Sequence, residues 1–96
     1  MPRPRMMRKI RFEPGVTYFK PAGVPMAQLE EVTLSFEELE ALRLQNIDGL
    51  GQDESAKKMA VSQPTFNRVI KEARKKVTEA LVNGNAIKIK GGDYKK

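Results

Sequence analysis

The residues best suited to bind another molecule lie in the second half of the sequence. Residues 57–77 carry seven lysines and arginines against one acid, Glu72, and Gln63 and Asn67 stand among these cations. Glutamine and asparagine can each form two hydrogen bonds with the edge of an adenine, and arginine can do the same with guanine. Lysine and arginine also attract phosphate groups. The pattern therefore indicates the chemistry of nucleic-acid recognition.

The charges of the chain are arranged in blocks, and the formal net charge is +6. Residues 1–11 hold five basic residues and no acid, whereas residues 28–54 hold eight acids and one arginine. Residues 57–77 are basic again. A polyanion is attracted to the two basic blocks and repelled by the acidic block between them.

Absent residue types restrict the chemistry of the chain. None of the 96 residues is histidine or cysteine, so the commonest general base, the strongest nucleophile and the usual zinc ligands are missing. Catalysis would have to rest on carboxylates, lysines or hydroxyls, and a hydrolase that uses carboxylates alone is a distant alternative. We expect no enzymatic activity, no metal site and no cofactor.

A cytoplasmic location is expected from what the sequence lacks. Without cysteine the chain cannot form the disulfides that are common in secreted proteins. No apolar run approaches the roughly 18 residues of a membrane span, and no apolar signal-peptide core follows the basic N-terminus. We therefore expect no association with a membrane.

Three helices are predicted to position the basic side chains. Ser35 followed by Glu38 forms a capping box that starts a first helix, and Asp48 with Gly49 ends it. A second, short helix fits residues 52–59, and Ser62 caps a third that runs to residues 83–84. The apolar stripe of the first helix is Phe36, Leu39, Leu42 and Ile47. The stripe of the third, predicted to be buried, is Phe66, Val69, Ile70, Ala73, Val77, Ala80 and Leu81.

The second and third helices are joined by a short turn, and the third is amphipathic and basic. This is the helix-turn-helix arrangement. Ala60 falls in the tight turn, where glycine would accept a positive φ more easily. Small or apolar residues stand where the two helices must be clamped together; they are Ala56, Met59, Val61, Phe66 and Val69.

The first 25 residues contain five of the six prolines, so we expect an extended arm there rather than a long helix. Residues 9–12 and 86–90 alternate polar and apolar side chains, as short strands do, and we expect them to pair and join the termini. The predicted fold is mostly α, with a winged-helix-like three-helix core, an extended N-terminal arm and a small two-strand sheet. Its parts are an arm packing on the core (1–34), a helical domain (35–84) with the helix-turn-helix at 52–82, and a strand with a basic tail (85–96).

This arrangement assigns roles to the polar side chains. Residues at the exposed start of the third helix are expected to contact base edges in the major groove; they are Ser62, Gln63, Thr65, Asn67, Arg68 and Lys71. Four other cations are expected to contact phosphates; they are Lys57, Lys58, Arg74 and Lys75. Arg3, Arg5 and Arg8 are expected to lie in the adjacent minor groove as homeodomain arms do. A merely solubilising arm is the alternative.

Several segments together resemble a known family. They are the opening Met-Pro-Arg-Pro-Arg and residues 18–25, 36–44, 61–66 and 73–77. The combination, which covers nearly the whole chain, resembles uncharacterised protein family 0251, also called domain of unknown function 134. The resemblance implies DNA binding through a helix-turn-helix similar to region 4 of sigma factors, and no catalytic activity. Met7 and Arg11 stand near positions where many relatives carry cysteine, and Gln63 stands where arginine is common, which implies a different base preference.

We predict a sequence-specific, double-stranded-DNA-binding transcriptional regulator. A homodimer is also expected, because the apolar end of the third helix can form a seam and many such proteins bind paired half-sites. One alternative is a protein-interaction module whose acidic first helix docks on RNA polymerase. RNA binding is another, although the few aromatic residues weigh against it.

Two further groups of residues have structural interpretations. Glu37, Glu38 and Glu40 form an acidic cluster, which we interpret as the solvated face of the first helix. Tyr18 and Phe19 are interpreted as anchors of the arm on the helical core.

Overall fold

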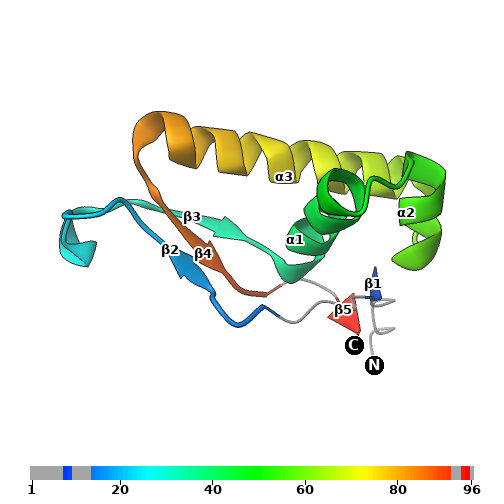
Figure 1. Cartoon of the computed structure of the whole chain (residues 1–96), viewed down its shortest axis with the longest axis horizontal. Helices are drawn as coiled ribbons and strands as arrows, with labels where there is room; N and C mark the ends of the chain where they lie inside the picture. Colours follow the sequence, from blue (N-terminus) through cyan, green and yellow to red (C-terminus); the bar gives the residue numbers. More distant parts are fainter. Residues whose placement is uncertain (1–7, 10–13, 92–93, 96) are drawn as a thin grey trace, which may run out of the picture.

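The computed structural model describes residues 8–9, 14–91 and 94–95. The long helix α3 lies across a three-stranded sheet, and the shorter helices α1 and α2 gather at its N-terminal half (Figure 1). The helical elements are α1 (Phe36–Leu42), the π-helical segment η2 (Arg43–Ile47), α2 (Gln52–Lys58), α3 (Gln63–Asn83) and the 3-10 turn η1 (Met26–Gln28). The strands are β1 (Arg8–Lys9), β2 (Tyr18–Phe19), β3 (Glu31–Leu34), β4 (Ala86–Ile89) and β5 (Tyr94–Lys95). The predicted mostly helical fold with three helices is confirmed.

Helix α1 begins at the capping box that the sequence predicts. The backbone N–H of Glu38 donates to the Ser35 hydroxyl over 3.1 Å, and the Ser35 N–H donates to Glu38 Oε1 over 2.8 Å. After Leu42 the helix continues as the wider π turn of η2, which ends at Asp48. The extra residue in that turn shifts the helical phase, so Ile47 is 79% exposed and does not extend the apolar stripe as predicted.

The connection between α2 and α3 also follows its local signals. Ala60 has a φ of 59°, the left-handed conformation that the sequence placed there. Ser62 caps α3 by accepting a hydrogen bond from the Thr65 backbone N–H over 3.3 Å. Gly84 ends the helix with a φ of 69°. Both helices therefore lie close to their predicted bounds.

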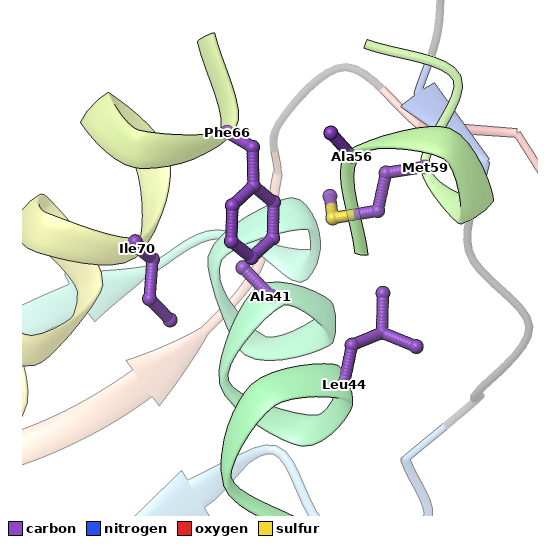
Figure 2. Close-up of a cluster of buried hydrophobic side chains, with 6 residues drawn as sticks. All are labelled: Ala41, Leu44, Ala56, Met59, Phe66 and Ile70. Atoms are coloured by element: carbon purple, nitrogen blue, oxygen red, sulfur yellow. The ribbon is translucent and has the colours of Figure 1, made fainter. Parts of the chain in front are cut away.

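The helices are held together by a cluster of buried apolar side chains. Figure 2 shows the Phe66 ring of α3 pointing towards Ala41 of α1, with Met59 and Leu44 beside them. Phe66 and Met59 are fully buried, which fixes the angle at which α3 leaves the turn. The buried members of the cluster are Ala41, Leu44, Ala56, Met59, Phe66 and Ile70.

The C-terminal half of α3 packs on the sheet, where Ala73 meets Leu34 and Ile89. Leu81 is 75% exposed and does not belong to the buried stripe as predicted. It lies about three turns beyond Ile70 on the same side of the helix. Ile70 is buried because α1 covers that side, whereas α1 crosses only the N-terminal half of α3 (Figure 1).

Strand β4 lies in the middle of the three-stranded sheet. It runs antiparallel to β2, with Phe19 opposite Ile87, and parallel to β3, with Val32 opposite Ile87. Residues 86–90 were predicted to pair with residues 9–12, and this prediction is wrong, because β2 and β3 occupy both edges of β4. Residues 10–12 lie outside the described part of the chain. A small sheet does join the termini, because β1 pairs with β5.

Tyr18 anchors β2 to the sheet rather than to the helices. Its hydroxyl donates to Glu31 Oε2 over 2.8 Å. This hydrogen bond, with desolvation and the negative charge of Glu31, raises the pKa of Tyr18 above its ordinary value. Phe19 remains 53% exposed, so the predicted anchoring of both rings on the helical core is wrong.

Candidate nucleic-acid interface

The start of α3 presents polar side chains away from the core. Gln63, Asn67, Arg68 and Lys71 are exposed, as the base-contacting prediction requires. Arg68 and Lys71 leave the helix on the side away from Phe66 and its buried neighbours, because buried and exposed positions alternate at helical spacing. Gln63 lies one turn before Phe66 and is exposed as the first residue of α3. No acidic residue occurs between Gln63 and Lys71.

Ser62 and Thr65 are engaged with each other. The Ser62 hydroxyl donates to Thr65 Oγ1 over 3.0 Å and also accepts the Thr65 backbone N–H. Ser62 is exposed and Thr65 is half-buried. Both hydroxyls therefore form the cap of α3, which is a second role beside the predicted contact with bases.

The four predicted phosphate-contacting cations fall into two groups. Lys57 and Lys58 are exposed in the last turn of α2. Arg74 and Lys75 lie in the middle of α3, where Lys75 forms a long ion pair of 4.0 Å with the exposed Glu79. Such surface pairs are weak, so they leave a cation available to other anions.

Arg74 is tied to the end of the first helix. Its Nη2 donates to Gln45 Oε1 over 2.7 Å and to Asn46 Oδ1 over 3.3 Å. The side chain is nevertheless exposed. Arg74 is therefore a surface cation whose direction is set by η2, a link that the sequence did not indicate.

The ridge that Arg68, Lys71 and Lys75 form is continuous. Their spacings of three and four residues place them on one side of α3. Glu72 lies within this span, and Glu79 follows one turn after Lys75. Arg68 and Lys71 are the cations of the ridge that stand next to Gln63 and Asn67 in the sequence.

Comparison with known proteins shows the family of this chain. The family model described as protein of unknown function DUF134 matches residues 1–96. The chain belongs to this family. UPF0251 proteins of Caldanaerobacter subterraneus subsp. tengcongensis and Thermoanaerobacter pseudethanolicus are each 58% identical to it over 95 residues, which is 99% of this chain and 80% of theirs. A UPF0251 protein of Moorella thermoacetica is 57% identical over 94 residues, 98% of this chain and 63% of that protein. No solved structure matches the chain.

Not every predicted site residue of this DUF134 protein can be placed. Arg3 and Arg5 of the predicted minor-groove arm lie outside the described residues. Arg8 begins β1, where its backbone pairs with Tyr94. The predicted role of the arm stays a prediction.

The acidic cluster of α1 is not the solvated face that the sequence suggested. Glu38 and Glu40 are only 6% and 2% exposed. Glu38 caps the helix and accepts a hydrogen bond from Lys76 Nζ over 2.9 Å. Glu40 accepts from Nε and Nη2 of Arg43 over 2.8 and 3.0 Å. The capping box had already assigned Glu38 to the helix start, and this was the signal against a solvated role.

Arg43 connects two carboxylates at the end of the first helix. Besides its bonds to Glu40, it donates through Nη1 to Asp48 over 3.0 Å. Hydrogen bonding to Glu40 is the largest of the effects that raise the pKa of the Arg43 guanidinium. The group therefore stays charged, which the buried Glu40 carboxylate requires.

Within residues 8–9, 14–91 and 94–95, no three acidic, histidine or cysteine side chains gather closely enough to hold a metal ion. None of the helices described there is both long and apolar enough to cross a membrane.

Proposed function

We propose that this protein binds double-stranded DNA in a sequence-dependent way through α2, the turn and α3, and so regulates transcription from the cytoplasm. The outward face at the start of α3 carries the proposal. Its exposed side chains Gln63, Asn67 and Arg68 are of the types that pair with adenine and guanine in the major groove. An α-helix is the element that the width of this groove admits.

The way α3 is held supports the same function. A helix that reads bases must keep its side chains in a fixed direction. Phe66 and Met59, both fully buried, fix α3 against α1 and α2. Lys57, Lys58 and Lys75 are exposed beside this face, where cations can position the protein on the phosphate backbone without reading sequence.

The proposal is tested by a fluorescence-anisotropy titration against a pool of random duplexes at two salt concentrations, followed by sequencing of the bound fraction. We expect affinity to fall steeply as salt rises and one shared motif to be enriched. Salt-sensitive binding without enrichment would overturn sequence-dependent binding. No binding at low salt would overturn the proposal as a whole.

A variant of Arg68 tests base reading directly. Arg68→Ala should cost about 1 to 3 kcal/mol of binding free energy and relax the preference at one position of the motif. Lys90→Ala removes an exposed cation at the end of β4 and should change neither quantity. An equal loss of affinity on every sequence would contradict a base-reading role for Arg68.

The sequence left two alternatives open, docking on RNA polymerase and binding to RNA. The burial of Glu38 and Glu40 removes two carboxylates from the surface that a docking first helix would use. The protein could bind purified RNA polymerase or single-stranded RNA but not duplex DNA. Either result would overturn DNA binding and support the corresponding alternative.

A further inference from the structure

An apolar groove lies between the sheet and the first helix. It encloses about 660 Å³. Val16, Phe19 of β2 and Ile47 of η2 line it. Leu39 and Leu42 of α1, Ile89 of β4, and Pro14 with Gly15 complete the apolar lining.

Large apolar side chains remain in contact with solvent around this groove. Val16 is 58%, Phe19 53% and Ile47 79% exposed. All three line the same hollow, although they come from separate parts of the chain. Exposure of apolar surface to water is unfavourable, so their gathering at one concave place favours an apolar occupant.

The size of the groove indicates what kind of occupant fits. Binding sites for small molecules commonly enclose about 300 to 1,000 Å³, and this groove falls inside that range. A folded protein partner needs a much broader surface, about 800 Å² on each side. The hollow therefore suits a small molecule.

The polar end of the groove indicates the charge of that molecule. Arg43 and Asn46 are its polar lining residues. The charge of Arg43 is balanced by Glu40 and Asp48, and Arg74 lies against Asn46. The charges of these two guanidinium groups and two carboxylates sum to zero, so the described residues at this end of the groove provide no net charge to attract an ion. The Asn46 amide can hydrogen-bond a neutral group.

We propose that this groove binds a small, uncharged, apolar molecule with one hydrogen-bonding group, and that the molecule regulates the proposed DNA-binding surface. The regulatory part rests on the proposed function. The π-helical segment η2 provides the link, because Ile47 and Asn46 line the groove while Gln45 and Asn46 hold Arg74 of α3. A ligand that donates a hydrogen bond to Asn46 Oδ1 competes with Arg74, which donates to the same oxygen, and so changes how this cation meets a phosphate.

The binding site is tested with the neutral probe N-phenyl-1-naphthylamine and no DNA present. Its fluorescence should rise and saturate at one probe per chain. The related sulfonate 8-anilinonaphthalene-1-sulfonate should bind at least about tenfold more weakly, because burying its charge is unfavourable. Val16→Glu should weaken binding of the neutral probe by at least about tenfold for the same reason.

Met26→Glu is the matched control, since Met26 is also 58% exposed but does not line the groove. It should leave probe binding unchanged. Equal losses in both variants, or binding that does not saturate at one probe, would overturn the site. The chain could instead form a concentration-dependent dimer that excludes the probe and that Val16→Glu abolishes. This result would overturn the small-molecule site and show that a second copy of the chain occupies the groove.

The regulatory part has its own readout. Saturating probe should change the dissociation constant for the selected duplex, and Asn46→Ala should remove that change while retaining most of the probe binding. One bound probe per chain with an unchanged dissociation constant would overturn regulation and leave the site standing. Because probe binding is measured without DNA, failure of the proposed DNA binding would leave its result intact.

Discussion

Arg43 and Glu40 show how one residue pair can decide the stability of the first helix. Glu40 is 2% exposed, and Arg43 stabilises its charge in the interior by donating two hydrogen bonds to it. Replacing a complete buried pair by apolar residues is often harmless, whereas removing one partner is not. The pair therefore acts as a unit.

We predict that Arg43→Leu lowers the free energy of unfolding by about 3 kcal/mol, because it removes two charge-assisted hydrogen bonds from the buried Glu40 carboxylate. Urea denaturation measures the loss. The double variant Arg43→Leu, Glu40→Leu should recover most of it. Lys75→Leu, which breaks an exposed ion pair of 4.0 Å, should cost less than about 1 kcal/mol. A double variant as unstable as Arg43→Leu would contradict this account.

Tyr18 gives a prediction about pH. Its pKa is raised in the folded chain, first by the hydrogen bond to Glu31, above the value of about 10 for an unfolded chain. The protonated hydroxyl therefore contributes stability below pH 10, and this contribution is lost as pH rises through the folded pKa. Absorbance titration at high pH in a Tyr94→Phe background should show Glu31→Ala lowering the pKa of Tyr18. An unchanged pKa would contradict the role of Glu31.

At the scale of the element, the turn between α2 and α3 is the feature most open to a local test. Ala60 adopts a φ of 59°, a conformation that disfavours any residue with a Cβ atom. The turn sets the direction in which α3 leaves α2. The chain therefore keeps the unfavourable φ of Ala60 to hold α3 in this direction.

We predict that Ala60→Gly raises the free energy of unfolding by up to about 1 kcal/mol, because glycine accepts positive φ without steric cost. Ala22→Gly, at an exposed position without positive φ, should instead lower it by up to about 1 kcal/mol through unfolded-state entropy. Thermal or urea denaturation compares the two. The same sign for both variants would show that the turn is not strained.

The helices α1 and α2 have seven residues each, which is too short for stability in isolation. A capping box starts α1, whereas the N-cap of α2 is Gly51 with no side-chain hydrogen bond among the described residues. Packing against Phe66 and Ile70 keeps both helices folded. The π turn of η2 also decides which side chains of the first helix are buried. It turns Leu44 into the core and leaves Ile47 at the groove, an outcome that regular helical spacing does not predict.

At the scale of the whole molecule, the exposed C-terminal end of α3 offers a surface through which two copies of the chain could form a dimer. Leu81 and Val82 are 75% and 77% exposed. The helix has 21 residues and so spans about 30 Å. Two such helices that meet at their C-terminal ends at an acute angle can hold their starts about 34 Å apart, which is the separation of paired half-sites on DNA. A contact between the ends of two α3 helices would place two reading faces on one side of a duplex.

We predict a dimer through this end of α3, detected as twice the monomer mass by sedimentation in the presence of a duplex with two half-sites. The double variant Leu81→Glu, Val82→Glu should restore the monomer and weaken binding to paired sites more than to a single site. Met26→Glu, which changes an exposed apolar residue elsewhere, should change neither. A monomeric mass with and without DNA would rule out the dimer.

The sequence by itself determined the features that depend on neighbours in the chain. The caps at Ser35 and Ser62, the left-handed Ala60 and the ends of the helices all follow from interactions over a few residues. For the same reason the sequence placed Gln63 and Arg68 on the exposed face of α3. Helical periodicity identifies the face of a helix without reference to the rest of the fold.

Only the tertiary structure decided which distant segments meet. Alternation of side chains marked residues 86–90 as a strand but could not name β2 and β3 as its partners. Charge alone suggested that Glu40 was solvated, whereas packing buried it beside Arg43. The groove and the bond from Arg74 to Gln45 join segments far apart in sequence. Such contacts depend on which elements compete for the same surface, and one-dimensional patterns do not record that competition.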